Sequence, residues 1–323
     1  MSNKIKKSEC RIKHFPISFF STILGLTGFT IATQKMGEMF PFLESFSLYI
    51  LFFTMAFFIA ITVLYIIKIL FFNSEVKSEF EHPVALNFFP TFSISLLLLS
   101  IAFYAVSPSF SQWLWILGTS LHFLLTLKIL SIWIQHSFEI KYMNPSWFIP
   151  AVGNILVPVI GVHFVSREIL WFFFSVGLIF WVVLLVIFFN RIIFHHPLPQ
   201  KLLPTLFILI APPAVGFISL VKLTSEINYF SRILYYFGLF MMLALFFQAK
   251  LFYKIKFYLS WWAYSFPISA ITIATILFFH KTGMWFYKYL AIILYGGLVV
   301  IIFFLLIKTA QAIGRADICV SEE

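Results

Sequence analysis

The chain has 323 residues, of which 62% are hydrophobic and 11% are charged, and its mean hydropathy is +1.00. Soluble domains carry about 25% charged residues, so this composition excludes a soluble protein. A membrane-spanning helix takes about 20 apolar residues, and strands of a membrane β-barrel alternate apolar with polar residues. The apolar runs here are long and uninterrupted, so we expect an all-α integral membrane protein.

The formal net charge of +10 raises the possibility of nucleic-acid binding. The basic residues, however, lie in short segments between apolar runs rather than on one soluble face, so we expect no nucleic-acid partner. The two cysteines, Cys10 and Cys319, lie in the two tails. This placement offers neither a disulfide framework nor a CxxC motif, and we expect no metal and no cofactor.

Charges and turn residues delimit ten apolar segments in chain order. They are residues 16–34, 46–72, 83–106, 110–136, 147–164, 169–190, 203–223, 229–250, 257–280 and 285–309. We interpret the first run as a retained span rather than a cleaved signal peptide. The predicted organisation is therefore a basic tail at 1–15, a transmembrane domain at 16–309 and a second tail at 310–323.

An even number of spans places both termini on one side of the membrane. With this topology, 16 of the 22 Lys and Arg residues lie on the side of the termini and six lie on the other side. The positive-inside rule then predicts that both termini are cytoplasmic. We expect a multi-pass protein of the cell (inner) membrane.

Proline marks every second segment. Each odd-numbered segment has a proline near its start or middle, and the even-numbered segments have none. The local motifs are spaced 54 to 74 residues apart and contain Pro16, Pro90, Pro150, Pro204 and Pro267. This repeat predicts five hairpins in series, each a proline-bearing helix followed by a proline-free helix.

A proline inside a helix removes a backbone hydrogen bond, and such a defect is tolerated in a bilayer only where the backbone is buried or faces water. We therefore expect the five proline-bearing helices to form an inner ring around a central pore. Hydroxyl residues in the first and ninth segments agree with this, namely Ser18, Ser21, Thr22, Thr27, Thr30, Ser265, Ser269, Thr272 and Thr275. The alternative is that the prolines only kink helices for packing and the hydroxyls bond to their own helices.

Acidic residues are excluded from the interior of all ten segments. Since intramembrane carboxylates are typical of proton relays and cation coupling, their absence argues against a proton pump, a sodium-coupled carrier and a cation channel. It favours an anion as the permeant. Lys128 is the one cation well inside a span. It is predicted either to help anions into the pore or to snorkel to the interface.

Three motifs carry a resemblance to a known family. They are residues 261–269 (WWAYSFPIS), residues 144–147 (NPSW) with 152–154 (VGN), and residues 210–216 (IAPPAVG). Together they resemble the tellurite-resistance/dicarboxylate transporter family, which includes bacterial TehA proteins and slow-type anion channels of plant guard cells. The resemblance implies helical hairpins in a quasi-five-fold ring around one pore per protomer, and a homotrimer.

The resemblance also implies a pore gate, a phenylalanine of the ninth helix that falls on Phe266. Pro267 follows it, as in the plant form, whereas glycine follows in TehA. If Phe266 faces the axis, helical spacing and the repeat predict eleven further pore-lining residues. These are Phe15, Ser18, Thr22, Phe89, Phe92, Ile149, Val152, Leu203, Leu206, Ser269 and Ile273.

The sequence thus predicts a channel for passive conduction of small anions such as chloride or nitrate. The alternative is a secondary carrier or exporter of dicarboxylates, tellurite or related oxyanions, although no span holds the pair of cations that would clamp a dianion. An enzyme is not expected, because the eight histidines form no HExxH or carboxylate–histidine cluster. His195 and His196 are instead interpreted as part of a solvated loop.

Overall fold

The fold was analysed in a computed structural model that describes residues 11–252, 255–315 and 317–319. Cys10 and most of the predicted basic tail lie outside these residues. Every regular element within them is helical. The long helices are α2 (Ser21–Gly37), α3 (Phe42–Phe71), α5 (Pro90–Phe103), α6 (Pro108–Gln135), α9 (Arg167–Phe194), α10 (Ala211–Thr224), α11 (Tyr229–Phe247), α13 (Ser265–Thr282) and α14 (Trp285–Arg315).

Shorter elements lie between these helices or continue them. The short α-helices are α4 (Asn73–Glu81), α7 (Phe148–Val152), α8 (Val157–Gly161) and α12 (Ala249–Phe252). The 3₁₀ helices are η2 (Ile17–Phe20), η3 (Ala85–Phe88), η4 (Ile140–Tyr142), η5 (Pro145–Trp147), η6 (Gly153–Leu156), η7 (Gln200–Ile210) and η8 (Leu259–Tyr264). Helix α4 was not predicted from the sequence.

Nine helical stretches in the described part of the chain are long and apolar enough to cross a membrane. They correspond to nine of the ten predicted segments. The predicted fifth segment is a shorter apolar stretch, Pro145–Gly161, broken into α and 3₁₀ pieces. The tenth continues to Arg315, so the first residues assigned to the second tail belong to α14.

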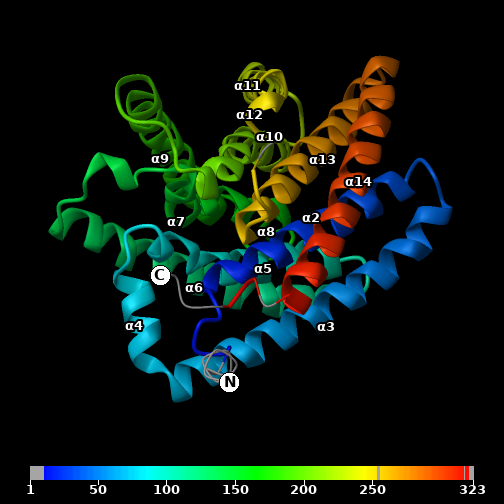
Figure 1. The fold of residues 1–323 in the computed structure, drawn as a ribbon. Helices are drawn as coiled ribbons and strands as arrows, with labels where there is room; N and C mark the ends of the chain where they lie inside the picture. The colour runs from blue at the N-terminus through cyan, green and yellow to red at the C-terminus, as the bar shows by residue number, and fades with distance from the viewer. Residues whose placement is uncertain (1–10, 253–254, 316, 320–323) are drawn as a thin grey trace.

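The odd-numbered segments form the interior, as the proline pattern predicts. In four of them, 67% to 83% of the residues in the most apolar stretch are buried, against 28% to 33% in the even-numbered helices. Each inner segment contacts the next in the order α2, α5, α7 to α8, α10 and α13, and α13 returns to contact α2. Each outer helix packs on the inner segment that precedes it, and α3, α9 and α14 lie at the periphery in Figure 1.

The prolines of the inner segments lie close to junctions between 3₁₀ and α geometry rather than at kinks within long α-helices. Pro90, Pro158 and Pro212 occupy the first turns of α5, α8 and α10, where a missing N–H removes no helical hydrogen bond. Pro204 lies within η7 itself. Pro108 likewise begins α6, so one even-numbered helix does contain a proline, at the position that tolerates it.

The inner hydroxyl groups mostly satisfy their own helices, which was the alternative interpretation of the sequence. Thr27 and Thr30 donate to the carbonyls of Ile23 and Leu26, and Thr272 and Thr275 do the same on α13. All four side chains are fully buried. A hydroxyl has one proton, so these groups cannot donate to an anion as well.

Helices α2 and α13 approach closely because glycine faces serine between them. A Cβ built on Gly25 would overlap the Ser265 side chain, at 2.7 Å from its Cβ, and would lie 2.9 Å from the Trp262 ring. A Cβ on Gly28 would lie 2.9 Å from Ser269. Small residues allow such close packing of helices in membranes.

Gly25→Ala is therefore expected to destabilise the fold by about 1 to 3 kcal/mol, since the added methyl group must displace α13. Gly296→Ala on α14 is the matched control, because its Cβ would meet nothing within 4 Å. Thermal unfolding in detergent measures both variants. Equal unfolding temperatures in the two variants would contradict the close contact between α2 and α13.

Candidate functional site

A cavity of about 810 Å³ is enclosed by the ring, and all five inner segments contribute to its wall. It reaches the side on which both ends of the described chain lie, where Lys13 and Asp317 line it. On this side Arg11 Nη1 donates to the carbonyl oxygen of Ile313 over 3.4 Å. We call this side of the molecule the terminal side, and we call the opposite side the far side.

The cavity ends partway along the inner helices, at apolar residues. The residues of its wall that lie furthest toward the far side are Leu24, Ile94, Leu156, Val215 and, on α13, Phe266 with Pro267. The Phe266 ring lies against α2, where a Cβ on Gly28 would be 3.3 Å from its Cδ2 atom. Each inner segment thus supplies at least one apolar side chain to this end of the cavity.

The structure brings four of the predicted pore residues together on the cavity wall: Phe266, Ser18, Ile149 and Val152. The hydroxyls of Ser18 and Ser21 also lie there and make no hydrogen bond to another described residue. They are therefore donors that the cavity can use. The roles of all these residues stay predictions.

The other predicted lining residues lie elsewhere. Thr22 and Ser269 are fully buried and donate to backbone carbonyls of their own segments. Phe92 packs against Phe20 and Phe58, with ring centroids 5.1 and 5.6 Å away. None of the remaining five contributes to the cavity wall, namely Phe15, Phe89, Leu203, Leu206 and Ile273.

The physical reason is register. One residue turns a helix by about 100°, and the inner segments mix 3₁₀ with α geometry, so a common offset from proline does not select a common face. Lys128 is exposed on the outer helix α6 and is not part of the cavity wall. An exposed position on an outer helix agrees with the second of the two predictions for Lys128, in which its side chain snorkels to the membrane interface.

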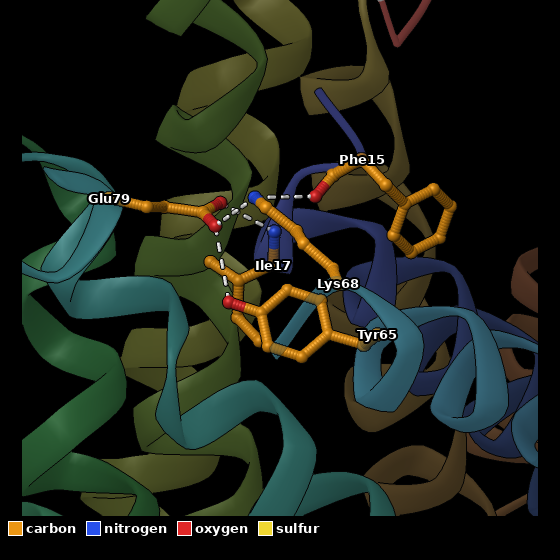
Figure 2. A network of polar contacts seen from close by, with 5 residues as sticks. All are labelled: Phe15, Ile17, Tyr65, Lys68 and Glu79. Carbon is orange, nitrogen blue, oxygen red and sulfur yellow. Dashed lines mark hydrogen bonds and ion pairs between the residues drawn. The ribbon is translucent and has the colours of Figure 1, made fainter. Parts of the chain in front are cut away.

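A buried ion pair anchors the start of the first inner segment at the cavity mouth (Figure 2). Lys68 Nζ donates to Glu79 Oε2 over 2.7 Å and to the Phe15 carbonyl over 2.9 Å. The backbone N–H of Ile17 donates to Glu79 Oε1 over 2.6 Å, and Tyr65 Oη donates to Oε2 over 3.1 Å. The Lys68 and Glu79 side chains are 4% and 12% exposed, so α3, α4 and the first inner segment meet at a desolvated pair.

Charges of both signs balance at this mouth. Lys13, Lys68 and Lys201 line the cavity together with Glu75, Glu79 and Asp317. Lys13 lies 3.6 Å from Glu75, and three donors surround the Glu79 carboxylate. The charged lining residues of this mouth therefore carry no net excess of positive charge.

Sequence reasoning missed the Lys68–Glu79 pair and the apolar residues at the closed end. Glu79 lies between the second and third predicted segments, and its approach to Lys68 depends on α4 folding back against the end of α3. The sequence spacing from the nearest proline motif differs among the apolar residues at this end, which are Leu24, Ile94, Leu156 and Val215. No spacing in the sequence could have selected them.

Comparison with known proteins shows which family this chain is similar to. Residues 14–310 match the family model described as voltage-dependent anion channel (SLAC1). The chain belongs to this family. Proteins similar to this chain occur in an archaeon, a plant and a bacterium.

Three relatives illustrate that range. An uncharacterized transporter of Methanocaldococcus jannaschii is 26% identical over 95% of this chain and 97% of its own length. The S-type anion channel SLAH3 of Arabidopsis thaliana is 30% identical over 91% of this chain, which spans 48% of that plant protein. The tellurite resistance protein TehA homolog of Haemophilus influenzae is 25% identical over 82% of this chain and 81% of its own. The family therefore supports transport of anions across a membrane.

Proposed function

We propose that the protein is a channel that conducts small anions passively through the central cavity, with Phe266 as its gate. The observation that carries this proposal is the cavity itself, which all five inner segments line and whose wall includes Phe266 and its apolar neighbours. Chloride and nitrate are the proposed permeants. In the closed state the aromatic ring occupies the narrow end, and opening moves the ring or its helix.

The direction of the inner segments supports an anion as the permeant. All five run from the terminal side to the far side, so the amino-terminal ends of the four longer helices α2, α5, α10 and α13 lie at the cavity wall. The amino-terminal end of a helix carries a partial positive charge. With Ser18 and Ser21 as free donors and no carboxylate within the apolar interior, the narrow end favours a negative ion.

A channel fits the cavity better than a carrier does. A dicarboxylate carrier needs a charged site that clamps two carboxylates. At the mouth, Lys13 and Lys68 each face a carboxylate of this chain, and the narrow end is apolar. Such a lining discriminates between anions by hydration cost rather than by tight binding.

Topology and assembly belong to the same proposal. The excess of Lys and Arg on the terminal side supports a cytoplasmic location for that side. The homotrimer rests on the family resemblance, with one conduit in each protomer. Native mass measurement of the protein extracted in detergent tests the trimer independently of transport.

Anion flux from proteoliposomes tests the proposed function. We expect flux of chloride and nitrate that rises linearly with concentration and exceeds the flux of sulfate and malate, because divalent anions lose more hydration energy than monovalent ones in an apolar neck. Protein-free vesicles are the control. Saturable flux that requires a counter-transported anion would favour the carrier instead.

A further inference from the structure

The far ends of the five inner segments form a second ring of contacts, distinct from the cavity. Gln34 Nε2 donates to the Ala102 carbonyl over 2.9 Å, which joins α2 to α5. The Tyr104 ring stacks on His163, with centroids 4.6 Å apart, and so joins the end of α5 to the turn that follows α8. We call this end of the ring the far mouth.

Charged groups make the remaining contacts at the far mouth. Burial, with a smaller contribution from the Lys222 ammonium of α10, lowers the pKa of His163. Lys281 Nζ on α13 donates to the Ser225 carbonyl at the end of α10 over 2.8 Å. His280 Nδ1 lies 3.0 Å from Glu38 Oε2, which joins α13 to the end of α2.

Cations outnumber acids at the far mouth. Lys222 interacts electrostatically with Lys35 of α2 and Lys281 of α13, and Glu38 is the one carboxylate acting on it among the described residues. Glu38 is itself engaged by Lys35 at 2.7 Å and by His280. Lys222 is half-buried and forms no hydrogen bond or ion pair within the described chain. The lysines of the terminal mouth, in contrast, are matched in number by carboxylates.

The helix directions make these cations necessary for an anion path. The carboxyl-terminal ends of the inner helices point to the far mouth, and each carries a partial negative charge that repels an anion. Lys35, Lys222 and Lys281 all lie in last turns of inner helices. Without these lysines, an anion that had passed Phe266 would meet only the partial negative charges of the helix ends.

We propose that the far mouth is an anion-docking site, at which Lys222, supported by Lys35 and Lys281, holds a small inorganic anion at the end of the conduit opposite the cavity. This inference rests on the proposed function and adds a location to it. The site contains three of the six Lys and Arg residues that the predicted topology places on the side opposite the termini, namely Lys35, Lys222 and Lys281.

Chloride binding to the purified protein in detergent tests the site, with the ³⁵Cl NMR line width at low ionic strength as the readout. Lys222→Gln is expected to weaken chloride binding on the order of fivefold, the effect of one charge about 4 Å away across water. Glu38→Gln is expected to strengthen it. Lys288→Gln is the matched control, because Lys288 lies on α14 over the Trp285 ring, outside this cluster, and its loss is expected to change nothing.

Lys281→Gln provides a second variant in case Lys222→Gln folds poorly. The proposal would be overturned if chloride affinity were equal in Lys222→Gln, Lys281→Gln and Lys288→Gln while only the first two had lower unfolding temperatures. Lys222 and Lys281 would then serve only to neutralise the partial negative charge of the helix ends. Binding does not require conduction. Wild-type protein whose chloride binding depends on Lys222, but which passes no anion, would contradict the proposed function and leave the docking site standing.

Discussion

Lys68→Met is expected to lower the free energy of unfolding by about 3 to 5 kcal/mol. The substitution leaves the Glu79 carboxylate desolvated, with only the Ile17 N–H and the Tyr65 hydroxyl as donors. A buried charge without its counterion costs far more than the pair itself contributes. Because Lys68 also holds the Phe15 carbonyl, the first inner segment loses its anchor as well.

The double variant Lys68→Met/Glu79→Gln separates the two effects. It removes both charges, so we expect much of the lost stability to return, as a double-mutant cycle in chemical or thermal unfolding measures. Lys141→Met is the control, because the Lys141–Glu139 pair is 58% and 66% exposed and its loss is expected to leave stability unchanged. Losses of equal size in Lys68→Met and Lys141→Met would show that Lys68 is solvated.

Phe266→Ala is expected to raise anion flux on the order of tenfold while leaving the helical fold intact. Holding the ring aside from its preferred rotamer costs about 1.4 kcal/mol, and this amount corresponds to a factor of ten in an equilibrium. Phe266 lies at the edge of the cavity, next to Gly28, so truncation widens the narrow end. Chloride efflux from proteoliposomes measures the change.

Phe92→Ala is the matched control for the gate. Phe92 was predicted to line the pore by symmetry with Phe266, but it packs on Phe20 and Phe58 away from the cavity. We expect its flux to equal that of the wild type. Higher flux in Phe92→Ala than in Phe266→Ala would place the narrow end of the conduit elsewhere.

The hairpin organisation could be predicted because the local composition differs between the odd-numbered and the even-numbered segments. Proline and hydroxyl residues gather in the odd-numbered segments, and burial in the structure follows the same alternation. The interpretation of individual groups was less successful. The prolines lie near 3₁₀ junctions, and Thr27 and Thr272 satisfy backbone carbonyls rather than line the cavity.

The details of the site depend on tertiary structure. The WWAYSFPIS motif located Phe266, and helical spacing with the proline repeat located Ile149 and Val152; all three lie on the cavity wall. Leu24 and Val215 could not be placed, because the rotation of each helix depends on its own 3₁₀ stretch. The Lys68–Glu79 pair and the far mouth join residues that only the folded ring brings together.

The reversal potential of the Phe266→Ala protein in a planar bilayer tests the central claim most directly. With a tenfold gradient of potassium chloride, we predict a current that reverses near the chloride equilibrium potential, about 59 mV in magnitude for a single charge. Reversal near the potassium potential, of opposite sign, would contradict an anion conduit. A current no larger than that of a protein-free bilayer would contradict conduction through the ring altogether.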